Sequence, residues 1–158
     1  MEIRVIRPEE YRVAGSVTAR AFAEFAPPDD GGWKEFLGLI ADVRGRIERT
    51  VVLVAVDGGR VVGSVTIELD GTVGDEVAEL PPDVACIRML GVDPSVRRRG
   101  IGRGLARAVI DRAREAGRVS WSCTRLPSSE RRTTCTSRWA SSEIRATTSR
   151  PTDTPRIG

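Results

Sequence analysis

Histidine is absent from this sequence of 158 residues, and cysteine is scarce. Without histidine the chain lacks Ser-His-Asp and Cys-His nucleophilic catalysis, histidine general bases and histidine-ligated zinc. Its three cysteines, Cys86, Cys123 and Cys135, form no C-x-x-C pair, so neither a zinc ribbon nor a disulfide framework is predicted. We expect no metal.

Long apolar runs are also missing. The longest, Val51–Val56, is far too short to cross a bilayer, and the N-terminus lacks the apolar core of a signal peptide. A composition that is 40% hydrophobic and 30% charged is typical of a soluble domain. We therefore expect a cytoplasmic protein that has no membrane partner.

The net charge of +3 comes from the C-terminal end of the chain. Residues 119–158 hold seven arginines against three acidic residues, whereas residues 1–118 hold 18 basic and 19 acidic residues. The same C-terminal segment has 16 serines and threonines, and its sparse apolar residues follow neither a strand nor a helix period. We therefore divide the chain into a folded domain over 1–118 and a Ser/Thr/Arg-rich tail over 119–158 that does not pack. The balanced charge of the domain gives no support for specific nucleic-acid binding.

The domain is predicted to be mixed α/β, with a central mixed sheet flanked by helices. Alternation of apolar and polar side chains predicts strands, and apolar residues at helical spacing predict helices. In chain order we expect a strand over 2–7, a helix from Pro8 to Phe25, a helix over 33–48, strands over 51–56, 61–69 and 84–92, and a helix over 101–116.

The segment from Leu90 to Leu105 carries the clearest chemical signal. A buried strand runs through Pro94 into a loop of arginines and glycines, which leads directly into a helix. Glycines let backbone N–H groups come close to a ligand, and the start of a helix favours an anion. Flanking arginines add charge-assisted hydrogen bonds to phosphate. The segment predicts a pyrophosphate-binding loop; the alternative is a solvated turn whose glycines serve only the turn.

The spacing of the glycines separates the candidate ligands. The sequence has no Gly-Lys pair, which a P-loop requires, and glycines at 100, 102 and 104 do not fit the G-x-G-x-x-G fingerprint of dinucleotide-binding folds. The pattern that fits is R-x-x-G-x-G, at Arg97, Gly100 and Gly102, preceded by Leu-x-Val-x-Pro. Over residues 2–118 the chain resembles the GNAT N-acetyltransferase superfamily, in which this pattern forms the coenzyme A loop.

The resemblance implies an enzyme that transfers an acetyl group from acetyl-CoA to the amine of a small-molecule or peptide acceptor. It implies that the backbone of Leu90, Gly91 and Val92 binds the pantetheine arm of CoA as an added strand would. It further implies that the loop holds the pyrophosphate, through Arg97, Arg98, Arg99, Gly100, Ile101, Gly102 and Arg103. Family members often dimerise through their C-terminal strands, so a homodimer is also an expectation.

The attacking amine must be neutral, so a base is required. Relatives often carry a glutamate early in the strand that corresponds to 84–92, but this chain has Cys86 there. Glu68 on the preceding strand is therefore the candidate base, followed by Asp70; the alternative for Glu68 is a solvated strand position. Cys86 is expected to be a small core residue, because no histidine is present to form a thiolate pair with it.

The C-terminal third departs from the family pattern. A fifth strand and a helix that often supplies a tyrosine acid should follow, yet 119–158 contains no tyrosine and no predicted strand pair. The codons of Trp139 and Ala140 force a glycine in the frame one base earlier, and neighbouring codons permit Leu-Tyr-Glu-x-Leu-Gly-Phe, which resembles the missing segment. We hypothesise that a frameshift near 117–120 replaced the end of the fold and impaired acetyl transfer. A natural tail without fixed structure is the alternative.

Two other functions stay open at this point. A non-catalytic module would bind CoA or a related phosphate ligand and be stabilised by it, without releasing thiol. Non-specific binding of RNA or DNA by the arginines at 97–99 and the tail would weaken steeply with salt and would ignore CoA. No aromatic stacking residues accompany the arginines of the domain, which argues against the second of these functions.

Overall fold

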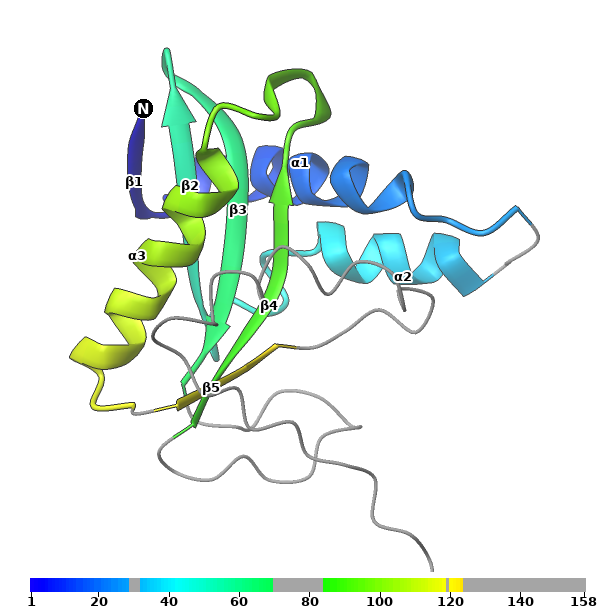
Figure 1. Cartoon of the computed structure of the whole chain (residues 1–158). Coiled ribbons are helices and arrows are strands. Elements are labelled where there is room, and N and C mark those ends of the chain that lie inside the picture. Colours follow the sequence, from blue (N-terminus) through cyan, green and yellow to red (C-terminus); the bar gives the residue numbers. More distant parts are fainter. Residues whose placement is uncertain (29–31, 70–83, 119, 124–158) are drawn as a thin grey trace, which may run out of the picture.

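The computed structural model describes residues 1–28, 32–69, 84–118 and 120–123. Within these residues, five strands form one sheet in the order β1-β2-β3-β4-β5 (Figure 1). The strands are β1 (Glu2–Val5), β2 (Val51–Asp57), β3 (Arg60–Glu68), β4 (Val84–Val92) and β5 (Ser120–Cys123). Neighbours are antiparallel from β1 to β4, and β5 is parallel to β4. The predicted mixed sheet is confirmed.

Helices cover both faces of the sheet (Figure 1). The helices α1 (Tyr11–Ala23) and α2 (Gly32–Ala41) lie on one face and α3 (Ile101–Glu115) on the other, while single turns η1 (Pro8–Glu10) and η2 (Pro94–Val96) precede α1 and α3. The core under α3 includes Leu53, Ala55, Val65, Ile67, Ala85, Ile87, Ile101, Leu105, Val109 and Ala113. The core on the α1 side includes Ile6, Ala14, Val43, Val52, Val54 and Val61.

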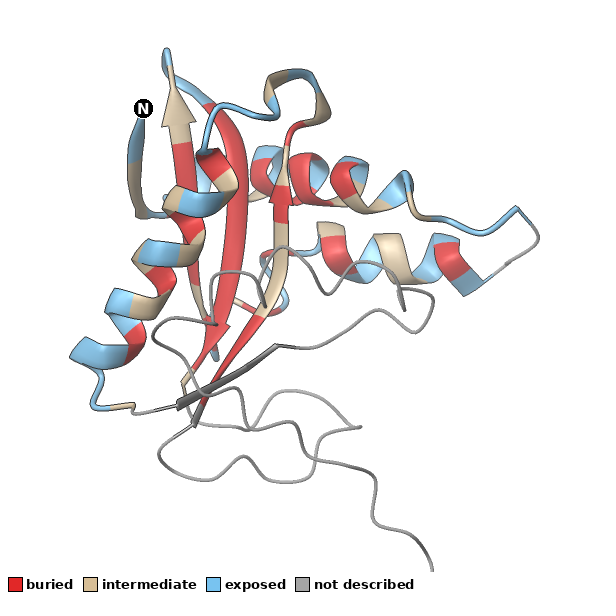
Figure 2. Cartoon of the chain, in the orientation of Figure 1, coloured by how far each residue is buried: buried red, intermediate tan, exposed pale blue. Residues whose placement is uncertain are grey.

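The polar face of β3 is buried, unlike the solvated position considered for Glu68. Ser64, Thr66 and Glu68 are only 1%, 2% and 1% exposed, and β3 is buried along nearly its whole length (Figure 2). The cause is the helical layer above them. Thr18 of α1 forms a 2.5 Å hydrogen bond with Ser64, and the Arg46 guanidinium donates to Thr66 over 3.2 Å. The alternation of apolar and polar side chains on β3 therefore distinguishes two faces that are both buried.

The second helix ends seven residues earlier than the sequence predicted, at Ala41 instead of Glu48. The Asp42 carboxylate accepts the N–H of Gly45 over 2.9 Å, which starts a series of turns. The Arg46 guanidinium donates to the carbonyls of Ile40 and Asp42 over 3.0 and 2.7 Å, so the last turn of the helix is capped by a side chain. Burial lowers the pKa of Arg46. Val43 is buried in the core although it lies in these turns, which is why the apolar helical period of the sequence continues beyond the end of the helix.

A fifth strand corrects the expectation that the fold ends near Gly117. Gly117 has a φ of 73° and ends α3, and the N–H of Arg118 donates back to the carbonyl of Ala113 over 2.9 Å. The chain then forms β5, which pairs with β4 from Val84–Ser120 to Ile87–Cys123. The predicted domain boundary at residue 118 therefore left β5 out of the folded domain. Residues 124–158, and with them the frameshift hypothesis, lie outside the described residues.

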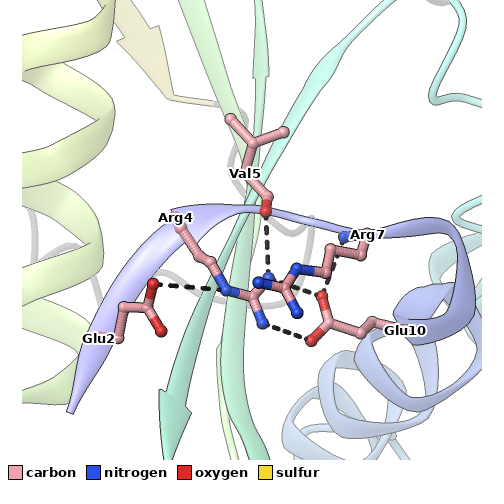
Figure 3. A network of polar contacts seen from close by, with 5 residues as sticks. All are labelled: Glu2, Arg4, Val5, Arg7 and Glu10. Atoms are coloured by element: carbon pink, nitrogen blue, oxygen red, sulfur yellow. Dashed lines mark hydrogen bonds and ion pairs between the residues drawn. The ribbon is translucent and has the colours of Figure 1, made fainter.

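The corner between β1 and η1 is held by an ion pair (Figure 3). Both terminal nitrogens of Arg4 donate to the two carboxylate oxygens of Glu10, over 2.8 and 2.7 Å, and the N–H of Arg7 adds a bond of 2.9 Å. The hydrogen bonds from Arg4 are the main cause that lowers the pKa of Glu10 to about 2, against the opposing effect of burial. The edge strand is thereby tied to the start of the first helix.

We expect Gly15→Ala to destabilise the fold, because α1 and α2 meet at this position without a side chain between them. A Cβ atom at Gly15 would lie 2.0 Å from the carbonyl oxygen of Ala41, which is backbone and cannot rotate away. Overpacking of this kind costs about 1–3 kcal/mol. Gly38→Ala in α2 is the matched control, since its Cβ meets nothing within 4 Å and alanine favours a helix by about 0.5–1 kcal/mol. Equal stability of the two variants in urea unfolding would contradict the close approach.

Glu10→Gln should lower the free energy of unfolding at neutral pH. Because the folded-state pKa lies below the ordinary value of 4.5, the stabilisation is complete above that value and is lost as the pH falls towards about 2. The difference between the urea midpoints of wild type and variant should therefore shrink over this pH range. Glu9→Gln, at the exposed neighbouring position, is the control and should change little. A difference for Glu10→Gln that stays constant with pH would count against the ion pair.

Candidate functional site

The strand β4 leaves its regular pairing with β3 in its middle. Thr66 pairs with Arg88 and Ser64 with Gly91, so two residues of β4 lie opposite one residue of β3. One of these two, Met89, has a φ of 54°, in the left-handed region that side chains rarely adopt. The irregularity is a β-bulge, which bends the strand and increases its twist.

The bulge lies where the partner on the other side of β4 ends. The last pair between β4 and β5 joins Ile87 to Cys123. From Arg88 to Val92, no strand of the described part of the chain pairs with this side of β4. The N–H and C=O groups of Leu90 to Val92 therefore have an edge at which an extended ligand could add as a strand.

Both faces of this half of β4 are covered. A Cβ atom at Gly91 would lie 2.9 Å from the Cα atom of Thr18, so α1 packs directly on the strand at this glycine. Leu90 and Val92 pack against the core under α3. The backbone of Leu90–Val92 is thus fixed between two layers, with only its edge uncovered by a strand.

The loop after β4 turns back sharply into α3. The Asp93 carboxylate accepts hydrogen bonds from the backbone N–H of Ser95 over 3.0 Å and from Arg20 over 2.9 Å. These contacts, the bond from Ser95 first among them, lower the pKa of Asp93. Arg98 and Gly100 then take left-handed φ angles of 65° and 78°, which direct the chain into the helix.

The start of α3 has backbone donors to offer. The first bond of the helix runs from the N–H of Gly104 to the carbonyl of Gly100, over 3.0 Å. Among the described residues, nothing accepts a hydrogen bond from the N–H groups of Ile101 or Gly102. A Cβ atom at Gly100 would meet nothing within 4 Å, so the space beside this glycine is open, whereas one at Gly102 would be in van der Waals contact with Val92 and Leu90, at 3.5 and 3.8 Å. The donors, the open space and the helix dipole fit a diphosphate.

The arginines of the loop have different partners. Arg97 pairs with Glu24 at 2.5 Å, and Arg99 pairs with Asp57 at 3.0 Å, so both tie the loop to other elements of the fold. Arg98 is exposed and makes no ion pair within the described ranges. Arg103 is exposed on the first turn of α3. The structure therefore brings all the predicted loop residues to one end of the sheet, beside the half of β4 that pairs with β3 but not with β5.

Glu68, the candidate base, lies at the end of β3 directly opposite Cys86. It therefore neighbours the strand position at which relatives often carry their glutamate. Its Oε2 atom lies 3.0 Å from Nε of Arg88, an ion pair that lacks the alignment of a hydrogen bond. Cys86 is 2% exposed and is the small core residue we expected. Asp70, the second candidate, lies outside the described residues.

Sequence reasoning missed Arg88 and the bulge at Met89. A signal for Arg88 was present, because it is a single charged residue in the apolar strand 84–92. No local signal marked Met89, since methionine has no preference for the left-handed region. The described residues contain no cluster of three potential metal ligands, and none of their helices is long and apolar enough to span a membrane.

Comparisons with known proteins agree with this geometry. The sequence model of the acetyltransferase (GNAT) family matches residues 18–131. A GNAT family acetyltransferase from Brucella melitensis, solved in complex with acetyl-CoA, is 25% identical, with a TM-score of 0.60 over 80% of this chain and 77% of that one. A GCN5-related N-acetyltransferase from Ralstonia eutropha JMP134 is 18% identical, with a TM-score of 0.65 over 97% of each chain.

The structure of AAC(6')-Iy in complex with the bisubstrate analogue CoA-S-monomethyl-acetylneamine is 14% identical, with a TM-score of 0.62 over 99% of this chain and 98% of that one. No curated protein matches the sequence. The family match begins in α1 and continues past β5, so it includes the bulged strand and the arginine–glycine loop. The chain belongs to the GNAT family of acetyltransferases.

Proposed function

We propose that this protein transfers an acetyl group from acetyl-CoA to the amine of a small acceptor. The observation that carries the proposal is the edge of β4 that has no partner strand after Ile87 in the described part of the chain. This strand leads directly into a loop and the start of α3, where the N–H groups of Ile101 and Gly102 have no acceptor among the described residues. The complex of the Brucella melitensis relative with acetyl-CoA supports the donor. The aminoglycoside analogue bound to AAC(6')-Iy supports a small-molecule amine as the class of acceptor.

The residues present would hold CoA in two places. The pantetheine arm carries amide groups, which would pair with the backbone of Leu90, Gly91 and Val92 along the uncovered edge. The pyrophosphate would bind the N–H groups of Ile101 and Gly102, where the dipole of α3 favours an anion. Arg98 has no carboxylate partner among the described residues and would add the nearest free positive charge, with Arg97, Arg99 and Arg103 beside it.

Acetyl-CoA, when bound, supplies an acetyl group as a reactive thioester. The residues of the chain must then remove a proton from the acceptor and stabilise charge on the carbonyl oxygen. The backbone at Met89 and Leu90 lies at the inner end of the uncovered edge and would provide N–H donors for that oxygen. Glu68 would accept the proton, and because its carboxylate is buried, the proton would reach it through a relay such as a water molecule.

We also propose that transfer by this chain is slow. Tyr11 is the one tyrosine of the sequence, and it packs against the core on the α1 side. Residues 119–158 contain no tyrosine, so they offer no phenol to protonate the leaving thiolate. Binding of CoA without measurable thiol release would favour the non-catalytic module over an enzyme.

Gly100→Ala tests the loop. An alanine at a φ of 78° is strained by about 1–2 kcal/mol, so the loop relaxes away from the binding conformation and the affinity for CoA should fall about tenfold. Gly117→Ala is the matched control, because its φ of 73° carries the same strain at the far end of α3. Isothermal calorimetry with CoA measures both. Absence of heat with the wild-type protein, or equal losses in both variants, would refute the assignment of the loop.

Glu68→Gln tests the base. Loss of a general base should lower kcat for acetyl transfer by about a hundredfold or more while leaving the affinity for CoA unchanged. Release of thiol in the presence of a panel of amines measures kcat, and Glu48→Gln, an exposed carboxylate, serves as the control. A Glu68→Gln variant with the kcat of the wild type would rule out this role.

A further inference from the structure

We propose that Arg88 is a positioning residue for acetyl transfer, which holds the Glu68 carboxylate in place beside the bulge of β4. The inference rests on the proposed function, specifically on the proton transfer assigned to Glu68. It adds a residue that neither the motif nor the family match singles out.

The register of the sheet places the two side chains on one face. Arg88 pairs with Thr66, and Glu68 pairs with Cys86, so Arg88 and Glu68 are diagonal neighbours across β3 and β4. Nε of Arg88 lies 3.0 Å from Oε2 of Glu68. The side chains are 16% and 1% exposed, so the contact is shielded from solvent and its charge interaction is little screened.

The charge on this pair has a physical consequence for Glu68. A carboxylate taken out of water loses its hydration, and a cation close to it offsets part of that loss and fixes its orientation. Arg88 is such a cation, because a guanidinium keeps its charge when buried. Arg46 is the other described cation on this face, and it is engaged by Thr66 and by carbonyls of α2.

The geometry of the pair differs from that of an ion pair built for stability in the same molecule. Arg4 grips Glu10 with both terminal nitrogens, at hydrogen-bond distance. Nε of Arg88 faces Glu68 without hydrogen-bond alignment, and its buried Nη2 atom also has no acceptor in the described part of the chain, whereas in Arg4 the buried atom without an acceptor is Nε. Such a pair is a weak source of stability, and an unsatisfied buried donor calls for another explanation.

The position of Arg88 in β4 supplies that explanation. It follows Ile87, the last residue paired with β5, and precedes Met89 with its left-handed backbone. Strained residues of this kind persist where the surroundings hold them, and they gather at functional sites. The ion pair therefore joins β3 to β4 at the point where the strand opens, beside the backbone donors that the proposed function assigns to the carbonyl oxygen.

A double-mutant cycle on the full chain tests the proposal. Arg88→Met should lower kcat about tenfold or more, leave the affinity for CoA and the KM of the acceptor unchanged, and have no further effect in the Glu68→Gln background. Arg88→Lys should restore most of the activity, because it keeps the charge. The double variant removes both charges, so it folds without an uncompensated ion, and calorimetry with CoA verifies that the donor site is intact.

Infrared difference spectra give a readout that needs no turnover. The carboxylate stretching bands of Glu68 should shift in Arg88→Met, because the contact with the guanidinium is lost, and this shift should disappear when Glu68→Gln is added. Absence of that shift, or additive losses of kcat in the cycle, would overturn the proposal. A higher KM confined to acceptors with a carboxylate would also overturn it, because Arg88 would then bind the acceptor. Full activity of Glu68→Gln alone would instead refute the base itself, so the two failures are distinguishable.

Discussion

The interrupted pairing of β4 is the constraint on which the rest of the site depends. Its first four residues pair with β5, and the bulge at Met89 then interrupts the regular pairing of the strand with β3. If the pairing continued to Val92, the backbone groups of Leu90–Val92 would be consumed by the protein itself. A sheet gives a ligand access to its backbone only where a neighbouring strand stops, and here the stop coincides with the loop that follows.

Carboxylates from distant parts of the chain balance part of the positive charge around this site. Glu24 and Asp57 neutralise two loop arginines, and Asp93 binds Arg20 of α1. The loop is therefore both attached to the fold and still cationic at Arg98, so that it can attract an anion without depending on one for its conformation. Glu68 and Arg88 form a further pair, between β3 and β4, and this pair is buried.

The arginine–glycine loop, most of the strands and the flanking helices were predictable because each depends on local signals. The apolar period of α3 and the alternation in β2 and β3 are such signals, and so is the R-x-x-G-x-G spacing at Arg97 to Gly102. The early end of α2 was not predictable, since it depends on the side chain of Arg46 reaching back to carbonyls of the helix. Nor was β5, because the polar–apolar alternation of Ser120–Cys123 spans only four residues, and the segment is extended by pairing with β4.

The sequence by itself determined the family of this protein and the place of its arginine–glycine loop, because both follow from residue types at fixed spacing along one segment. Only the tertiary structure decided that Glu68 is buried, that Arg88 faces it, and that β5 pairs with only the first half of β4. These features depend on contacts between segments that are distant in the chain, between β3, β4, β5 and the helices above them. The periodicity of side chains along one strand does not show which of its faces and edges neighbouring elements cover.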